Sequence, residues 1–514
     1  MKMDETYMIK VLIMRIVQSG MKLFMKTFQR GILVLCNVFL ANMFVCLSAK
    51  TVNVIDFGAV SDTTVLSTDA FNKAVNECSS VGGGIVIVPP GDYLCSTIFL
   101  KDNVTLHIET GATLYASRNV DDYRDYTRLS GAADTENVET LVMARNSRNV
   151  SVTGGGTLHC RAVREGYIRE PQKEITDSIT GREIANAIKY GADYRSKFRK
   201  VPPYTGAISM AGCENVRIEN IRVIESSFWS VHIQGCNRVK VEGIYIESDS
   251  TNGVNADGLD IDGSSDVVIS NCIIRTGDDA LCLKSTNLGG YSRPVRNITI
   301  SNCILTSSSA AFKIGTETHD DFTNIVMTDC VIDNANRGLN IIVRDGGRVS
   351  NVIFSNIVIN TVRKATFWWG NGDPVWFTVQ KRGDIPSAGY IDNIILSNII
   401  ANGQSGVRME GFDNTIRNIR INDFHLFMEH EDAVDKRARN GFLFHGVDGL
   451  AMRDCSVRWD IDNPQDEWES AYLFRNVNGL ELVRTYGDKA PNGKYPAFRY
   501  DNVIWKDHKK HCLE

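Results

Sequence analysis

The sequence predicts an all-β solenoid of the parallel β-helix class, with a helical cap at its N-terminal end. Three observations predict this fold. A short alternating apolar phrase, preceded by a polar residue, recurs along the chain at steps of 23 to 42 residues. A small polar residue follows at the same position in most copies. No helical pattern of useful length fits between the copies.

The repeat is clearest from residue 216 onward. The first apolar positions of its copies are Val216, Val239, Val267, Ile298, Ile325, Val352, Ile394, Ile419, Leu450 and Leu480. Four residues further on stand the small residues Asn220, Gly243, Asn271, Asn302, Asp329, Asn356, Asn398, Asp423 and Asp454. Asn and Asp suit tight corners because they tolerate left-handed backbone and bond their own main chain. We therefore expect one corner of the solenoid at each of these positions.

An apolar residue follows each corner, and in four copies it is a cysteine. These are Cys272, Cys303, Cys330 and Cys455. Their stacked positions predict small buried hydrophobic side chains. No cysteine pair has the spacing of a zinc site, so we expect no metal at these positions.

A helix is predicted before the first coils, over residues 67–78. Phe71, Ala74, Val75 and Cys78 share one face of it, and glycines follow at 82–84. A solenoid leaves its core open at each end, so this amphipathic helix is expected to cover the first coil.

Residues 1–49 have the pattern of a secretory signal peptide, and Met21 is a possible true start. Lys22, Lys26 and Arg30 precede an almost wholly apolar run over 31–47, and small residues follow for cleavage. We expect an exported protein, periplasmic or extracellular, with no stable membrane insertion after cleavage. A single membrane anchor is the alternative, although the apolar run is short for a span.

Residues 50–514 are predicted to form a single catalytic domain, with excursion loops at about 161–205 and 361–391. The 514-residue chain is 43% hydrophobic, which argues against disorder. Its net charge of −5 gives no basic footprint, so nucleic-acid binding is not expected.

Two acidic segments lie one coil apart. The first contains Asp257 and the second contains Asp278 and Asp279, and Asp279 follows Asp257 by 22 positions. Stacked coils are about 4.8 Å apart, so these carboxylates can converge. Repulsion and burial should raise one pKa, which leaves an acid beside ionised partners. That equipment fits glycoside hydrolysis; calcium binding and solvated corners are the alternatives.

The segment from about 205 to 347 resembles glycoside hydrolase family 28, the polygalacturonase-like pectin hydrolases. The matching motifs are SFWSVH at 227–232, NADGLD at 255–260, GDD at 277–279, KS at 284–285, GTE at 315–317 and RGL at 337–339. The resemblance implies a right-handed β-helix and an inverting mechanism. Asp278 would be the general acid, and Asp257 and Asp279 the base. Inverting pairs are commonly about 6.5–9.5 Å apart.

The sequence departs from the family at three basic positions. Ser309 stands for the family's histidine, Asn340 for its arginine and Ile342 for its lysine. Those cations normally face a galacturonate carboxylate. Their loss favours either a neutral sugar such as rhamnose there, or an exo-acting enzyme that captures the chain end by other residues.

Other residues are candidates for substrate binding. They are Asn255, His232, Lys284, Lys313, Glu317, Arg344, Trp368 and Trp369. The lysines and the arginine can bind uronate carboxylates. The tryptophans lie in a Gly- and Pro-rich run that is unsuited to a buried strand, and they fit stacking on sugar rings.

The sequence thus predicts an inverting glycoside hydrolase that cleaves galacturonate-containing pectic glycans, exo-polygalacturonase-like or rhamnogalacturonan-type. No cofactor and no metal are expected, because two carboxyl groups and water suffice. We expect a monomer whose partner is the pectic polysaccharide. A β-helix polysaccharide lyase and a non-catalytic glycan-binding β-helix are the alternatives.

Overall fold

A computed structural model describes residues 8–10, 12–22, 25–26, 50–123, 138–162, 167–171, 196–200, 204–250, 253–287, 291–364, 370–433 and 435–506. The chain divides into two compact units, residues 1–50 and 51–514. In the first unit the described residues up to 26 are helical. No helix among the described residues combines the length and the apolar character that crossing a bilayer requires. The predicted apolar run and cleavage site at 31–49 lie outside the described residues, so the signal peptide stays a prediction.

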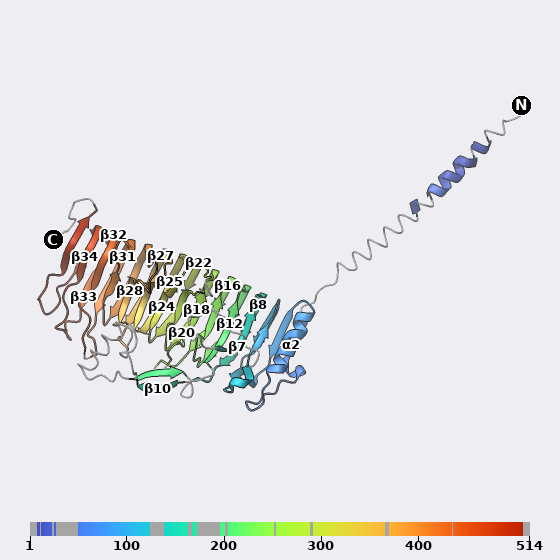
Figure 1. Cartoon of the computed structure of the whole chain (residues 1–514), viewed down its shortest axis with the longest axis horizontal. Helices are drawn as coiled ribbons and strands as arrows, with labels where there is room; N and C mark the ends of the chain where they lie inside the picture. The colour runs from blue at the N-terminus through green and yellow to red at the C-terminus, as the bar shows by residue number, and fades with distance from the viewer. Residues whose placement is uncertain are drawn as a thin grey trace. The chain divides into compact units, whose positions relative to one another are not determined.

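The second unit is a right-handed parallel β-helix, as predicted. Its 34-stranded sheet winds so that each strand pairs in parallel with a strand of the next coil (Figure 1). Three rows of strands result, and each row is one wall of the solenoid.

The first row, which carries the site, comprises β4 (Ile98–Leu100), β7 (Val138–Arg145), β12 (Tyr204–Ala211), β15 (Val231–Gln234), β18 (Leu259–Asp262), β21 (Leu281–Ser285), β24 (Ala310–Thr318), β26 (Arg337–Val343), β28 (Asp373–Val379), β30 (Val407–Glu410), β32 (Phe442–Arg453), β34 (Tyr472–Val483) and β36 (Phe498–Trp505).

The second row comprises β1 (Lys50–Asn53), β2 (Gly84–Val88), β5 (Val104–Ile108), β8 (Arg148–Gly154), β13 (Glu214–Glu219), β16 (Asn237–Glu242), β19 (Ser265–Ser270), β22 (Val295–Ser301), β25 (Phe322–Ala335), β27 (Arg348–Thr361), β29 (Tyr390–Gly403) and β31 (Ile416–Met428).

The third row comprises β3 (Gly91–Cys95), β6 (Ala112–Ala116), β9 (Thr157–His159), β14 (Arg222–Ile224), β17 (Tyr245–Glu247), β20 (Ile273–Thr276), β23 (Ile304–Ser307), β33 (Ser456–Trp459) and β35 (Tyr486–Gly487). The long strands β25, β27, β29 and β31 continue from the second row into the third.

The corners have the backbone that the repeat predicts. Asn271, Asn302 and Asn356 have φ values of 58°, 55° and 55°. Their side chains form ladders from coil to coil; Asn356 Nδ2, for example, donates to Asp329 Oδ1 at 3.0 Å. The four corner cysteines are buried and free, so their predicted packing role is confirmed.

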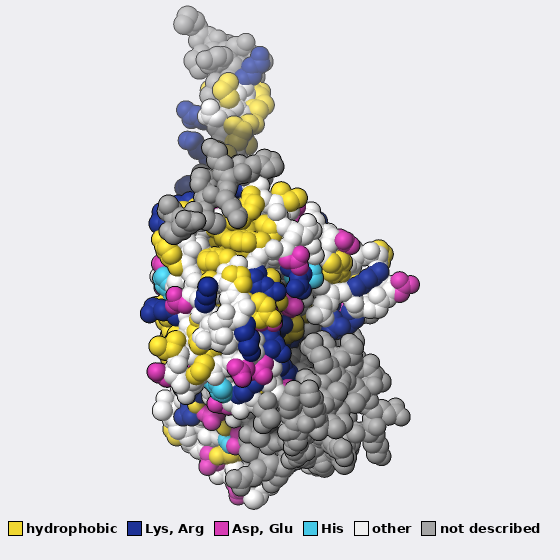
Figure 2. Space-filling model, turned by 90° about the vertical axis from the view of Figure 1, so that its left-hand side faces the viewer, with side chains coloured by type: hydrophobic (Ala, Val, Ile, Leu, Met, Phe, Trp, Pro, Cys, Tyr) yellow, Lys and Arg dark blue, Asp and Glu magenta, His cyan; other side chains and the backbone are white. Residues whose placement is uncertain are grey.

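The predicted cap is α2 (Thr68–Ser80), which lies at the N-terminal end of the solenoid (Figure 1). Phe71, Ala74, Val75 and Cys78 are fully buried in the common core. Two short 3-10 turns, η1 (Val54–Phe57) and η2 (Val120–Tyr123), lie in the same part of the chain. At the other end, β36 leaves apolar side chains such as Tyr500 and Ile504 exposed, and Figure 2 faces this end.

The two predicted excursions differ from each other. In the first, the described residues include β10 (Tyr167–Pro171) and β11 (Ser196–Lys200), an antiparallel pair outside the main sheet. The second was wrong in part, because residues 373–379 form β28 in the first row and are all buried. A strand that is buried on both faces has no polar alternation, and Pro374 lies near its start, where proline is tolerated.

Candidate active site

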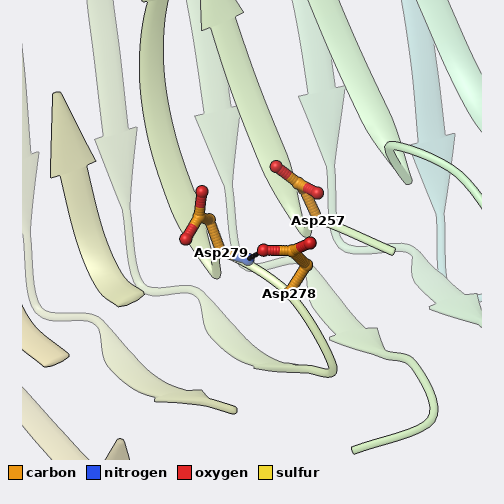
Figure 3. Close-up of side chains that lie close together, drawn as sticks. All are labelled: Asp257, Asp278 and Asp279. Atoms are coloured by element: carbon orange, nitrogen blue, oxygen red, sulfur yellow. Dashed lines mark hydrogen bonds between the residues drawn. The ribbon is translucent and has the colours of Figure 1, made fainter. Parts of the chain in front are cut away.

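Asp257, Asp278 and Asp279 converge at the start of the first-row strands (Figure 3). One carboxylate oxygen of each lies within 4.8 Å of the other two. The register explains this convergence. Leu259 of β18 pairs with Leu281 of β21, so Asp257 and Asp279, each two residues earlier, hold equivalent positions in adjacent coils. The predicted convergence of the two acidic segments is therefore present.

The three aspartates are close because two backbone segments pack without side chains between them. Gly258 is followed by β18 and hydrogen-bonds through its N–H to Asp279 O at 2.9 Å. A Cβ at Gly258 would lie 2.4 Å from Ala280 O, which no real contact allows. Glycine at this point keeps the coils of Asp257 and Asp279 in contact.

Asp278 is half-buried and accepts two backbone hydrogen bonds. Asn255 N–H and Asp279 N–H donate to its two oxygens, each at 2.9 Å. Burial and the neighbouring Asp279 carboxylate raise the pKa of Asp278. Asn255 thus contributes its main chain, in a left-handed conformation with φ of 61°.

Asp279 is buried among donors. Lys313 Nζ lies 2.6 Å from Oδ2, while Ser309 Oγ and Ala310 N–H donate to Oδ1 at 2.8 and 3.1 Å. Burial alone would raise the pKa of Asp279. The charges of Lys313 and Arg337 outweigh burial and hold it well below the ordinary value. Asp279 is therefore the carboxylate that stays ionised.

Asp257 also faces a lysine, at a longer distance than that between Lys313 and Asp279. Lys284 Nζ is 3.4 Å from Asp257 Oδ2, 3.6 Å from Asp260 and 3.6 Å from Glu317. No described residue donates a hydrogen bond to the buried Oδ1 of Asp257. Burial, and then the carboxylates of Asp260 and Asp278, raise the pKa of Asp257 well above its usual value.

Asp260 is a site residue that the sequence analysis did not single out. It is fully buried, and no described residue hydrogen-bonds either carboxylate oxygen. Burial raises its pKa to about 7. In the sequence, only its position in the NADGLD segment pointed to a role for Asp260. Its contact with Lys284 could not be predicted in the same way, because Lys284 lies on β21 in the next coil.

His232 lies at the edge of this cluster, where it was predicted. Its Nε2 is 3.2 Å from Asp262 Oδ2, and its ring meets the Trp229 ring edge-on at 4.8 Å between centroids. Thr286 also hydrogen-bonds Asp262, through its N–H and its hydroxyl. Trp229 in turn lies 4.4 Å from Lys284 Nζ. His232 thus supports the wall of the site.

The three departures from the family fall into two kinds. Ser309 and Asn340 belong to a polar network with Arg337, which donates to Ser309 Oγ and, at 2.9 Å, to Asn340 Oδ1. Ile342 is buried and apolar. None of the three supplies a cation.

Two of the three predicted cations, Lys284 and Lys313, lie against carboxylates of the protein. Lys284 and Lys313 are buried against the catalytic cluster, as above, and Arg344 lies just after β26. A cation that the sequence analysis missed, Arg382, pairs with Asp345 at 2.7 and 2.6 Å and lies 3.9 Å from Glu317. Trp368 and Trp369 lie outside the described residues.

The three aspartates are also close enough together to bind one metal cation between their carboxylate oxygens. However, the ammonium groups of Lys284 and Lys313 already offset the negative charge. This pairing disfavours an additional divalent ion. The oppositely shifted pKa values of Asp278 and Asp279 instead suit an acid and a base in one site.

Known proteins of one family resemble this chain. The sequence model of a family described as "Glycosyl hydrolases family 28" matches residues 78–426. An "Exo-poly-alpha-D-galacturonosidase" of Dickeya chrysanthemi is 21% identical over 406 residues, 73% of this chain and 62% of that protein. A "Probable rhamnogalacturonase A" of Aspergillus niger is 22% identical over 422 residues, 79% of this chain and 78% of that protein.

Among solved structures, an exopolygalacturonase of Thermotoga maritima has the same fold. It aligns with a TM-score of 0.60 and 23% identity, over 80% of this chain and 92% of that one. The chain spans 52 to 62% of the length of the first three curated relatives that it matches, less than two thirds of each.

Proposed function

The chain belongs to glycosyl hydrolases family 28, and from this premise we propose that it hydrolyses galacturonate-containing pectic glycans. One observation carries the proposal. Asp278, whose pKa is raised, lies beside Asp279, whose pKa is lowered, so an acid and a base share one small site. This division of charge is what hydrolysis of a glycosidic bond by direct water attack requires.

In the proposed mechanism, protonated Asp278 donates its proton to the glycosidic oxygen as the bond to the sugar breaks. Asp279, with Asp257, holds the attacking water, whose oxygen bonds to the anomeric carbon. Asp279 takes the proton that the water loses. Asp278 ends ionised and Asp279 protonated, and exchange with solvent restores both for the next cycle.

The distances between the carboxylates bear on whether the anomeric configuration is inverted or retained. The nearest oxygens of the three carboxylates lie within 4.8 Å, closer than the roughly 6.5–9.5 Å usual for inverting pairs. A water that makes two hydrogen bonds of about 2.8 Å still spans this gap. We therefore propose inversion, and proton NMR of the first product anomer tests it. The retained anomer would contradict single-step water attack.

Within the pectic class, we favour a rhamnogalacturonan-type substrate over polygalacturonate. Lys284, Lys313 and Arg382 each lie against a protein carboxylate. A paired cation attracts a uronate carboxylate less than an unpaired one does, so a neutral sugar fits better past the cleavage point. The exo-polygalacturonase reading stays the alternative, and the resemblance to the Dickeya enzyme supports it.

The test is product analysis on polygalacturonate, rhamnogalacturonan and defined oligosaccharides. Saturated new reducing ends that are lost in Asp278→Asn would support hydrolysis, and the substrate that yields them names the bond. Unsaturated products would identify a lyase. Equal results for wild type and the variant would favour a non-catalytic glycan-binding protein.

We propose also that the protein is exported and acts as a monomer. The pattern of residues 1–49 supports export, and the mature protein would then begin near Lys50. Intact-mass measurement of secreted protein tests the cleavage, and light scattering tests the monomer. A full-length mass in the membrane fraction would instead indicate an anchor.

A further inference from the structure

A line of polar contacts leads away from Asp279 across three further strands of the first row. Asp279 contacts Lys313 of β24, and Arg337 of β26 approaches the same carboxylate, with Nη2 3.6 Å from Oδ1. Arg337 Nη1 donates to Asn340, and Asn340 Nδ2 donates to Trp376 O of β28 at 2.7 Å. The orientation of Arg337 is thus fixed from the side opposite to the site.

We infer that Arg337 and Lys313 are positioning residues for Asp279, and that they supply the charge which keeps this carboxylate ionised and oriented toward the water. The inference rests on the proposed function and deepens it, because it assigns the support of the general base. It also assigns Lys313 a role other than the substrate binding that the sequence predicts.

Burial separates a positioning role from a substrate-binding role. Arg337 is 2% exposed and Lys313 is 8% exposed. Arg337 Nη2 donates to Ser309 and Arg337 Nη1 to Asn340, and Lys313 Nζ donates to Asp279. A sugar carboxylate would have to displace these contacts to reach either cation.

The charges around Asp279 explain why both cations are needed. The carboxylates that face it are Asp278 on its own segment and, from the preceding coil, Asp257 and Asp260. The facing cations are Lys284 on β21, Lys313 on β24 and Arg337 on β26, and the Cys282 thiol lies on β21. Lys284 is shared among Asp257, Asp260 and Glu317. Among the described residues, the ion pairs of Lys313 and Arg337 are instead made with Asp279.

Ser309 lies between Asp279 and Arg337 and hydrogen-bonds both. It stands where the family has a histidine, and its hydroxyl donates to Asp279 while accepting from Arg337. A hydroxyl orients a carboxylate but carries no charge, so the positive charge must come from residues behind and beside it.

The first experiment measures kcat/KM against pH for wild type, Arg337→Met, Lys313→Met and Arg337→Lys. We expect each Met variant to lose about tenfold at the acid end, with the acid limb moved to higher pH. Arg337→Lys should recover part of the loss. Arg363→Met, which removes a buried arginine paired with Glu431 and Asp435, is the matched control and should keep the wild-type profile.

The second experiment needs no substrate, so it separates this inference from the proposed function. A carboxyl whose folded pKa is held low stabilises the fold above its unfolded pKa, and this stability is lost as pH falls. Arg337→Met should therefore cost more stability at pH 7 than at about pH 2.5, which lies below the unfolded Asp pKa of about 3.9. In an Asp279→Asn background the same change should cost equally at both pH values.

The inference is overturned by either of two results. One is a pH–activity profile that stays unchanged in the Arg337→Met/Lys313→Met double variant while KM rises, which would make these cations substrate-binding residues. The other is a stability cost of Arg337→Met that is the same at both pH values with Asp279 present.

Discussion

The aspartates of this site differ in the direction in which their pKa values are shifted, because each one has different neighbours. Asp257, Asp260, Asp278 and Asp279 are all carboxyls in one patch. Lys313 and Arg337 hold the pKa of Asp279 low, whereas burial raises the pKa of Asp260 to about 7. The sequence places these groups near one another, but the direction of each pKa shift depends on which cation each one meets.

Replacing the proposed acid tests the central role. We expect Asp278→Asn to lower kcat by about 10²- to 10⁴-fold with KM little changed, because the amide cannot donate a proton to the leaving oxygen. Steady-state kinetics on the active substrate measure this loss. Asp329→Asn is the control, since Asp329 lies exposed at a corner and its amide can still accept from Asn356. Wild-type activity in Asp278→Asn would move the acid role elsewhere.

Asp260 gives a prediction of pH-dependent stability. Its folded pKa of about 7 exceeds the unfolded value, so the folded state holds the proton and loses stability as pH rises from about 4 to 7. We expect Asp260→Asn to remove up to about 4 kcal/mol of this loss. Urea unfolding at pH 4.5 and at about pH 7.5 measures it.

Asp262 is the matched control, two residues further along β18. Burial raises its pKa, but hydrogen bonds from His232 and Thr286 outweigh burial and lower it. Asp262→Asn should therefore cost the same stability at pH 4.5 and at about pH 7.5, because both values lie above the unfolded pKa of about 3.9 and the wild-type carboxyl is ionised at both. Equal pH dependence in both variants would mean that neither carboxyl titrates as described.

Among the structural elements, corners were easier to predict than strands that are buried on both faces. Asn and Asp mark the corners because their side chains tolerate positive φ and form ladders. The strand β28 carries no such signal, since all seven of its residues are buried and its coil has a long connection. Period-two alternation can be recognised only where one face of a strand meets water.

A corner variant separates backbone conformation from the side-chain ladder. Asn356 has φ of 55° and bonds both Asp329 and Asn398. Asn360 bonds its neighbours in the same way and is not among the residues with positive φ. We expect Asn356→Ala to cost about 1–2 kcal/mol more than Asn360→Ala, and Asn356→Gly to restore most of the difference. Chemical unfolding measures all three, and equal costs at the two positions would assign the effect to the ladder alone.

Across the whole molecule, stacking joins residues from many coils into one core. Phe312, Phe354 and Phe377 form a continuous aromatic cluster, in which Phe354 meets Phe312 edge-on at 5.4 Å and Phe377 at a tilt at 6.1 Å between ring centroids. Phe312 and Phe377 belong to β24 and β28 of the first row, whereas Phe354 projects inward from β27. Core packing therefore connects the first-row wall, which carries the site, to the second-row wall.

Removing the central ring tests this connection. We expect Phe354→Ala to lower the free energy of unfolding by about 3–5 kcal/mol, because a large cavity opens in a closed core. Phe427→Ala, at a ring that is 36% exposed, should cost far less. Guanidinium unfolding gives both values. A small loss for Phe354→Ala would show that neighbouring coils collapse into the space.

The sequence by itself determined the parallel β-helix, its helical cap and the two acidic segments, because corner residues, apolar periodicity and helix amphipathicity are local signals. Register then brought Asp257 and Asp279 together, as the one-coil spacing implied. Only the tertiary structure decided which residues support them. Lys313 and Arg337 lie 34 and 58 residues beyond Asp279 in the chain, and their burial against its carboxylate depends on how three coils stack. That stacking decides that Lys313, which the sequence predicts as a substrate-binding residue, lies against Asp279 together with Arg337.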